Sequence, residues 1–443
     1  MIMCSDASVV ELKDSTSLSE SRSVLARYGG HLFWTATDQI INIGVPRLVL
    51  YPILAVILGD GAFGSFVVAI TLVQTIGLSP SNGLTAYVLR DLAKVEPSEQ
   101  RVMLKTAACL SGLILLPIAA MFWFGAEYIA TLYGNNRAFA GLLPWLGIYL
   151  LLVNLCDTLL SATRVARGFQ RMVLVHAVQV ALFFLAIPFF RWFDIDGVAA
   201  AYVVGAAAGT LVAVLLLSSF LKGAPWWSWR FAKAAMRVWP SFSLSAFITL
   251  SSGNLDRLLL GYWWSAEAVA PFFAAVATAA LWVAPSMPIS NLTLSLLGAF
   301  KDAHQIPRRR FVQVAAGALG SGVVIFALGW VLGGPLLRLL YPHLADAALP
   351  LWGSAVAAFS ATHVGTLCRP FVCKFCPPWI LPCLAAWTLV TRLVPLLLFI
   401  PSGGAKGAVS GLLIGSILSG GAWLVVFVYY FLPREKREGD GLA

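Results

Sequence analysis

The sequence predicts an all-α membrane protein with about twelve transmembrane helices, arranged as two related bundles of six. Composition is the first reason, since 59% of residues are hydrophobic and only 11% are charged, whereas about a quarter are charged in soluble domains. Mean hydropathy is +0.84. Second, many apolar runs reach the ~20 residues that cross a bilayer. Third, features of the first half recur about 210 residues later, as in transporters built from repeats.

The apolar runs predict helices, because backbone groups in lipid must form hydrogen bonds within their own segment. We expect spans at 32–54, 62–88, 104–124, 139–162, 172–190, 196–217, 241–262, 268–297, 311–332, 347–367, 378–400 and 406–431. Prolines inside several of them predict kinks.

The repeat pairs residues at near-constant offset. The pairs are Arg47 with Arg257, Asn82 with Asn291, Tyr133 with Tyr341, Gly197 with Gly407 and Gly205 with Gly415. Six spans per half is an even number, so both halves start on the same side of the membrane. The halves are therefore expected to be parallel repeats, with the substrate path between them.

The distribution of charge predicts the topology. With the N-terminus inside, 23 of the 30 Lys and Arg residues fall in cytoplasmic segments, which follows the positive-inside rule. We therefore expect a multi-pass protein of the cytoplasmic (inner) membrane with both termini cytoplasmic. The polar residues 1–27 lack a secretory signal. The net charge of +10 then reflects topology, and nucleic acid is not expected as a partner.

The expected domains follow from these spans. They are a polar cytoplasmic tail at 1–30, an N-terminal six-helix bundle at 31–218, a cytoplasmic interfacial linker at 219–240, a C-terminal bundle at 241–432 and a cytoplasmic tail at 433–443. The linker carries Trp226, Trp227 and Trp229 beside Arg230, a composition typical of membrane interfaces. Binding of an anionic lipid substrate there is the alternative interpretation.

Three arginines inside predicted spans are the main candidates for substrate binding. Arg47, Arg257 and Arg392 lie ~14–16 residues into spans that run outward, hence at similar depth at ~1.5 Å per residue. Arginine stays charged and binds phosphate or carboxylate with a planar fork. We predict a cationic layer that holds an anionic group of the substrate. Snorkelling to headgroups or pairing with buried acids is the competing interpretation.

Aspartates and asparagines accompany the arginines. Asp38, Asp157 and Asp256 are candidates for proton coupling, since burial raises a carboxyl pKa; hydrogen bonding between helices is the alternative. Adjacent residues point ~100° apart on a helix, so Asp256 is not expected to pair with Arg257. The candidate substrate-binding asparagines are Asn42, Asn82, Asn254 and Asn291. For Asn82 and Asn291, which follow Pro80 and Pro288, stabilising the proline kinks is the alternative role.

No cofactor, metal or catalytic centre is predicted. The chain has no Walker loop and no His-Glu-x-x-His motif. Seven cysteines are an odd number, and no disulfide framework is implied. Cys373 and Cys376 have a spacing that suits zinc, with Cys368 nearby, but incidental thiols are the preferred interpretation.

Several motifs resemble those of bacterial polysaccharide and O-antigen flippases, over essentially residues 30–432. The segment 58–66, LGDGAFGSF, continues to an arginine motif at 89–93. Asp256-Arg257 with Gly261, and the turn at 265–269, resemble a second element, and the paired glycines of spans six and twelve fit as well. Pro271-Phe272-Phe273 departs from the Gly-x-Tyr that the family tends to have. The resemblance implies the V-shaped, alternating-access fold of the multidrug/oligosaccharidyl-lipid/polysaccharide exporter superfamily.

From this resemblance and the arginine layer we predict a flippase, not an enzyme. It would move a polyprenyl-pyrophosphate-linked oligosaccharide, an O-antigen or exopolysaccharide repeat unit, across the membrane. The coupling would be cation or proton antiport, with membrane lipids as neighbours and glycan polymerase or export proteins as candidate partners. The alternatives are a multidrug or cation exporter of the same superfamily, disfavoured by the arginines, and a membrane glycan-assembly enzyme, disfavoured by the short external loops. A non-transporting scaffold is a further alternative.

Overall fold

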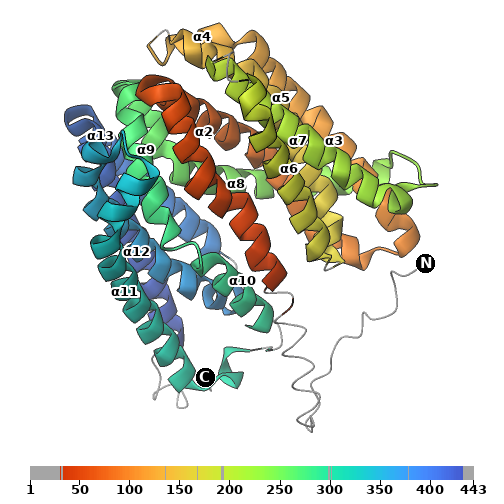
Figure 1. Ribbon diagram of the computed structural model, residues 1–443. Coiled ribbons are helices and arrows are strands. Elements are labelled where there is room, and N and C mark those ends of the chain that lie inside the picture. The colour runs from red at the N-terminus through yellow and green to blue at the C-terminus, as the bar shows by residue number, and fades with distance from the viewer. Residues whose placement is uncertain are drawn as a thin grey trace.

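The computed structural model describes residue 30 and residues 33–432, apart from 135, 167, 191–193, 298–299, 301 and 378. The described residues are helical and include no strand. The chain enters at Phe33 and forms two π-helical segments, Ile40–Gly44 and Pro46–Leu50. The α-helices that follow are α2 Tyr51–Asp91, α3 Pro97–Phe124, α4 Ala126–Thr131, α5 Arg137–Val165, α6 Phe169–Phe190, α7 Asp194–Leu221, α8 Trp229–Trp263, α9 Ala266–Leu281, α10 Ser286–Leu297, α11 Arg308–Leu340, α12 Ala345–Phe375 and α13 Ile380–Phe431 (Figure 1).

Every predicted span corresponds to a helical segment, so the all-α polytopic fold is confirmed. The boundaries between spans differ in three places. Spans one and two form one run that kinks at Gly59, where φ is +71°. Spans eleven and twelve form α13, which kinks at Gly404 with φ +54°. Glycine permits both kinks, because residues with a Cβ rarely adopt positive φ. Span eight is instead broken into α9 and α10 by the turn at 282–285.

Seven helical runs are long and apolar enough to cross a membrane, and two of them are the kinked double spans. The remaining predicted spans correspond to α8, to the broken pair α9 and α10, and to α12. These helices carry polar residues inside the membrane, such as Asp256 and Arg257 on α8 and His363 on α12. Polar residues within spans face the interior of a bundle, so these side chains of α8 and α12 are expected to point inward, whereas α9 is apolar and only too short to count as a span.

The two halves share a core at one end only. One hydrophobic cluster joins Phe63 and Phe66 of α2 with Val269 of α9, Tyr341 and Ile400 of the second half. We call this the closed end; it contains the kinks and α4. At the other end, the basic end, each half has its own cluster, around Leu84 to Phe231 in the first half and around Phe311 to Phe427 in the second.

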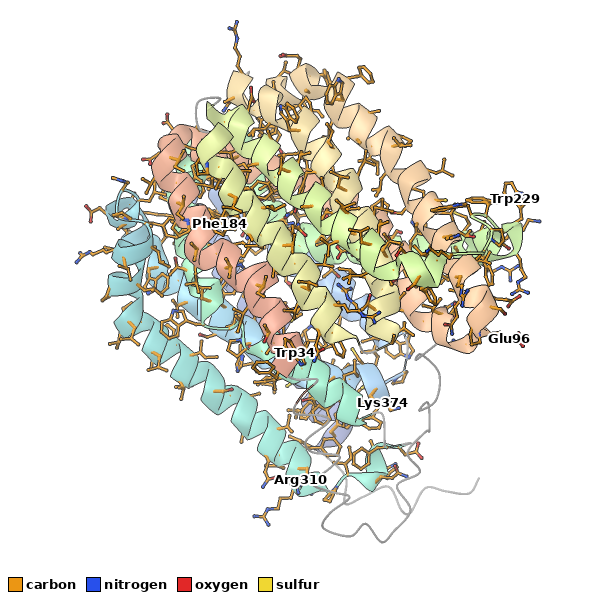
Figure 2. The ribbon with its side chains drawn as sticks, turned by 45° about the vertical axis from the view of Figure 1, so that its right-hand side comes forward. Trp34, Glu96, Phe184, Trp229, Arg310 and Lys374 are labelled. Carbon is orange, nitrogen blue, oxygen red and sulfur yellow. The ribbon has the colours of Figure 1, made fainter. Side chains whose placement is uncertain are left out.

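The bundles therefore meet at the closed end and diverge toward the basic end. In Figure 2, Glu96 and Trp229 lie at the right-hand edge of the molecule, and Arg310 lies at its lower end, apart from them. An ion pair of 2.5 Å between Arg230 and Glu99 fixes the start of α8 on the first half. The helix then crosses to the second half, so α8 connects the two arms of a V.

Candidate functional site

A distorted stretch of the first span carries Arg47. Pro46 lacks the N–H that would continue an α-helical ladder, and the backbone takes π-helical turns on both sides of Val45. Such turns are rare in proteins, and those that occur are often found at functional sites. The Arg47 side chain is half-buried there, in the neighbourhood of Tyr51 and Tyr341.

Arg257 lies on α8, and its guanidinium contacts two neighbouring side chains. Its guanidinium lies 5.5 Å from the ring centre of Phe273, a cation–π contact. Its Nη1 donates a hydrogen bond to Asn254 Oδ1 at 3.3 Å, and Asn254 Nδ2 donates to Thr75 Oγ1 on α2 at 2.9 Å. The predicted candidate Asn254 thus links Arg257 to the opposite half.

Arg392 comes from α13, and its Nη1 donates to the Ser252 carbonyl at 3.0 Å. Arg257 lies close enough to both Arg47 and Arg392 for their positive charges to repel one another, so the structure brings the three predicted arginines near one another. The Nε atoms of Arg257 and Arg392 are buried without a hydrogen-bond partner. Because an unsatisfied buried donor is costly, this arginine cluster suits an anion that accepts several hydrogen bonds.

Four aromatic rings close the space beyond the arginine cluster. Tyr51 and Phe63 of the first half contact Phe273 of the second half at 5.1 and 5.8 Å between ring centres, and Phe63 lies 6.5 Å from Tyr341. We call these four residues the aromatic plug. It lies at the closed end, where the two halves share one core.

The other asparagine candidates do not join this cluster by any described contact. Asn42 and Asn82 are exposed side chains, and no hydrogen bond to the arginines is described for them. Asn291 falls within α10, but its side chain lies outside the described residues. Pro80, which precedes Asn82, receives hydrogen bonds on its carbonyl from Trp239 Nε1 at 2.9 Å and Ser243 Oγ at 3.5 Å. Those α8 side chains, not Asn82, donate to that carbonyl.

The three aspartates have different surroundings. Asp256 is buried, accepts a hydrogen bond from the Arg257 backbone N–H at 2.8 Å, and lies 3.8 Å from Arg257 Nε. The expectation that Asp256 and Arg257 do not pair is therefore wrong. The carboxylate folds back onto the next peptide, and the long arginine side chain bends toward it. Asp157 lies 3.7 Å from Arg164 and is a third exposed.

Asp38 forms a buried pair that the sequence analysis missed. Its Oδ1 lies 2.6 Å from His176 Nδ1 on α6, and both side chains are at least nine-tenths buried. His363 is similarly buried, with Nδ1 2.5 Å from Ser286 Oγ and Nε2 2.7 Å from Ser321 Oγ. A histidine within an apolar span is an intramembrane ionisable residue, so this signal was present in the sequence.

Among the described residues, no group of three or more His, Cys, Asp or Glu side chains is arranged to hold a metal ion. Cys368, Cys373 and Cys376 are free thiols. Burial raises the pKa of Cys376, at the end of α12, to about 11. The thiol is therefore protonated at neutral pH, although the thiolate is the form that binds metals.

The fold is shared with known transporters. The lipid II flippase MurJ in an inward closed conformation has a TM-score of 0.70 at 11% identity, with 93% of this chain and 88% of MurJ covered. A mutant of the Vibrio cholerae MATE transporter VcmN has a TM-score of 0.65 at 16% identity, covering 93% and 98%.

A third structure has a title that states a reversed polarity of its binding pocket. It is a MOP superfamily transporter from Pyrococcus furiosus, with a TM-score of 0.65, 15% identity and 90% and 95% coverage. Identities this low establish the fold alone. No curated protein sequence matched significantly. Residues 31–298, more than half of the chain, match the family described as polysaccharide biosynthesis protein. This chain is therefore a multi-pass membrane protein with the fold of MOP superfamily transporters, and it belongs to the polysaccharide biosynthesis protein family.

Proposed function

We propose that this protein is a flippase that moves a polyprenyl-pyrophosphate-linked oligosaccharide across the cytoplasmic membrane. The observation that carries the proposal is the convergence of Arg47, Arg257 and Arg392 from three helices of both halves. Family membership in polysaccharide biosynthesis and a fold shared with a lipid II flippase support the same function.

A pyrophosphate group matches the chemistry of the arginine cluster. Guanidinium groups remain charged at all relevant pH values and bind phosphate oxygens in pairs. The Nε atoms of Arg257 and Arg392, which make no hydrogen bond in the structure, would donate to those oxygens. Asp256 offsets part of the positive charge, which favours reversible binding over permanent capture of the substrate. A cationic drug would meet net repulsion, so we prefer the flippase to the cation exporter.

The V-shaped arrangement supports alternating access. The halves are separate at the basic end and closed by the aromatic plug at the other. We propose that the basic end faces the cytoplasm, where basic residues gather. The substrate headgroup would enter from that side, reach the arginine cluster below the plug and leave when the plug opens. The lipid tail would remain in the bilayer.

For the coupling ion we propose a proton carried by Asp38. Of the three aspartates, Asp38 is buried with an imidazole at hydrogen-bond distance, which allows one proton to be shared and released. Asp157 and Asp256 each have an arginine neighbour instead. Asp38→Asn is expected to abolish the dependence of flipping on a pH gradient; an unchanged dependence would exclude this assignment.

The test is a flipping assay in proteoliposomes with a fluorescent lipid-linked oligosaccharide. A triple variant with Arg47, Arg257 and Arg392 changed to Ala should lose transport. Arg338→Ala, which removes an exposed arginine at the closed end of α11, is the matched control and should transport normally. Full transport by the triple variant, with normal insertion in the liposomes, would show that the arginine cluster does not bind the substrate.

A further inference from the structure

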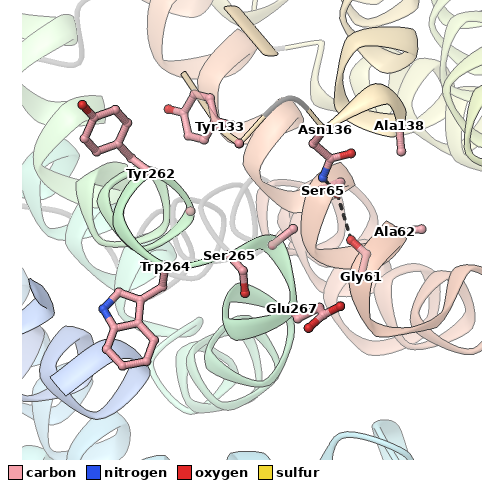
Figure 3. Close-up of a pocket in the computed structure, with 13 residues that line it drawn as sticks. Gly61, Ala62, Ser65, Tyr133, Asn136, Ala138, Tyr262, Trp264, Ser265 and Glu267 are labelled. Atoms are coloured by element: carbon pink, nitrogen blue, oxygen red, sulfur yellow. Dashed lines mark hydrogen bonds between the residues drawn. The ribbon is translucent and has the colours of Figure 1, made fainter. Parts of the chain in front are cut away.

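A second cavity lies at the closed end, on the far side of the aromatic plug from the arginine cluster. It has a volume of about 540 Å³ and is lined by the start of α2 after its kink, the α4–α5 loop and the α8–α9 turn (Figure 3). Gly261 and Tyr262 line it, four and five residues beyond Arg257 on α8. At ~1.5 Å per residue, it lies ~6–8 Å beyond the arginine layer.

One wall of this cavity is aromatic. The rings of Tyr133 and Tyr262 lie 6.3 Å apart in an edge-to-face arrangement, and Figure 3 shows them together along one side. Burial, with the nearby Tyr262 as a second cause, raises the pKa of Tyr133 to about 12. The Tyr133 hydroxyl is therefore protonated at neutral pH and can donate a hydrogen bond.

Neutral polar groups and one acid line the rest of the cavity. Asn136 Nδ2 donates to Ser65 Oγ at 2.7 Å, while Asn136 Oδ1 accepts the Phe139 backbone N–H at 3.2 Å and caps α5. Ser265 and Glu267 also line it (Figure 3). These hydroxyl, amide and carboxylate groups offer both donors and acceptors.

The charge of the lining distinguishes this cavity from the arginine cluster. Glu267 is the only charged residue among the described residues that line it, and none of them is Lys or Arg. A pyrophosphate would be repelled there. Aromatic ring faces beside fixed hydrogen-bonding groups suit a neutral sugar, which has apolar C–H faces and a rim of hydroxyls. The volume lies within the range of sites that hold small-molecule ligands.

We propose that this cavity is a saccharide-binding subsite that receives the oligosaccharide part of the substrate outside the aromatic plug. The inference rests on the proposed flippase function and adds a second place where the substrate is held. Both halves contribute to the cavity, so its shape depends on how they close. The subsite would form around the sugars as the two halves close again behind them, and it would keep them from returning.

The test uses a lipid-free, phosphate-free oligosaccharide, released by acid hydrolysis from the lipid-linked substrate of the flipping assay. Saturation-transfer NMR on the purified full-length protein in nanodiscs would measure its binding. Tyr262→Ala and Asn136→Ser should weaken binding about tenfold, or ~1.4 kcal/mol; serine retains the helix cap but lacks the amide donor. Tyr128→Ala removes a 73% exposed tyrosine of α4 outside the cavity and should bind normally.

The outcomes separate this inference from the proposed function. The triple arginine variant should bind the soluble sugar as wild type does, although it should not flip. A wild type that flips the lipid-linked substrate without binding the soluble sugar would overturn the subsite and leave the flippase proposal intact. If the wild type binds the soluble sugar but does not flip the lipid-linked substrate, and Tyr262→Ala loses the binding, the result would support the subsite and overturn the flippase proposal. Equal binding by wild type and both cavity variants would also overturn the subsite.

Discussion

Arg257 is the side chain on which the arginine cluster converges. It interacts with both other arginines, lies over Phe273 and reaches Thr75 through Asn254. Its own neighbour Asp256 fixes its backbone N–H. A single residue therefore connects the arginine cluster, the aromatic plug and the opposite half of the molecule.

Arg257→Ala is expected to reduce the flipping rate roughly 10- to 150-fold, because hydrogen bonds to charged groups contribute about 1.5–3 kcal/mol. Arg257→Lys should lie between this variant and wild type, since lysine keeps the charge but not the fork. The rate in proteoliposomes measures both. Equal rates for the Lys and Ala variants would mean that charge at this position has no role.

The buried pair of Asp38 and His176 predicts that substitutions of the two residues have non-additive effects on stability. Removing one member of a buried pair costs about 3–5 kcal/mol, whereas an apolar replacement of both is often neutral. Asp38→Leu and His176→Leu should each lower the unfolding temperature in detergent, and the double variant should lower it by less than their sum. Additive losses would show that the 2.6 Å contact contributes no coupling.

At the scale of elements, α2 packs against the second half through glycines. A methyl group at Gly64 would overlap the Ala266 carbonyl of α9, and one at Gly261 would lie 2.8 Å from Val68 Cγ2. Small residues permit such close approach of membrane helices. Because Phe63 of the plug adjoins Gly64, this contact also positions the plug.

Gly64→Val should therefore separate α2 from the α8–α9 turn and destabilise the closed end by about 1–3 kcal/mol, the usual cost of overpacking. Fluorescence-detected thermal unfolding would measure the loss. Gly112→Val is the matched control, because Gly112 lies within α3 and no atom lies within 4 Å of an added methyl group. Equal unfolding temperatures for the two variants would contradict the close packing at Gly64.

The kink of α13 shows how elements and side chains depend on one another. Gly404 adopts positive φ, and the Trp264 indole lies against it while its Nε1 donates to the Ile400 carbonyl at 2.9 Å. That carbonyl is released from the regular helical ladder near the kink. The end of α8 thus stabilises the connection between the last two spans.

At the scale of the whole molecule, one shared core and two separate ones define a protein closed at one end. Gly61 of α2 and Glu267 of α9 meet at that end: a Cβ at Gly61 would lie 3.6 Å from Glu267 Cγ. Transport by alternating access requires these segments to separate. A covalent link between them would hold the molecule in the closed arrangement.

A variant with Gly61→Cys and Glu267→Cys, in a background without the seven native cysteines, is expected to form a disulfide, because a Cβ at Gly61 would lie 3.6 Å from the Glu267 Cγ, the atom whose place the cysteine sulfur would take. Oxidation should stop flipping, and a reductant should restore it. Each single-cysteine variant is a control and should respond to neither treatment. Normal flipping by the fully cross-linked protein would show that transport does not require the closed end to open.

Much of this arrangement was predictable from residue patterns. The spans followed from apolar length, and the arginines were recognisable as charges in apolar surroundings. The sequence analysis predicted separate spans on either side of Gly59 and of Gly404, whereas the structure has one kinked helix at each place. The difference was not predictable, because a short loop and a kinked helix have similar composition. The Asp38–His176 pair and the cavity between Tyr133 and Tyr262 join residues far apart in sequence, which no local pattern reports.

The sequence by itself determined that this chain crosses the membrane many times in two related halves, since hydropathy and repetition act locally along the chain. Only the tertiary structure decided which end is closed, which polar groups meet and where an aromatic plug separates a cationic cluster from a neutral cavity. The physical reason is that these features arise from packing between helices of different halves. Such packing depends on distances in space that residue order does not encode directly.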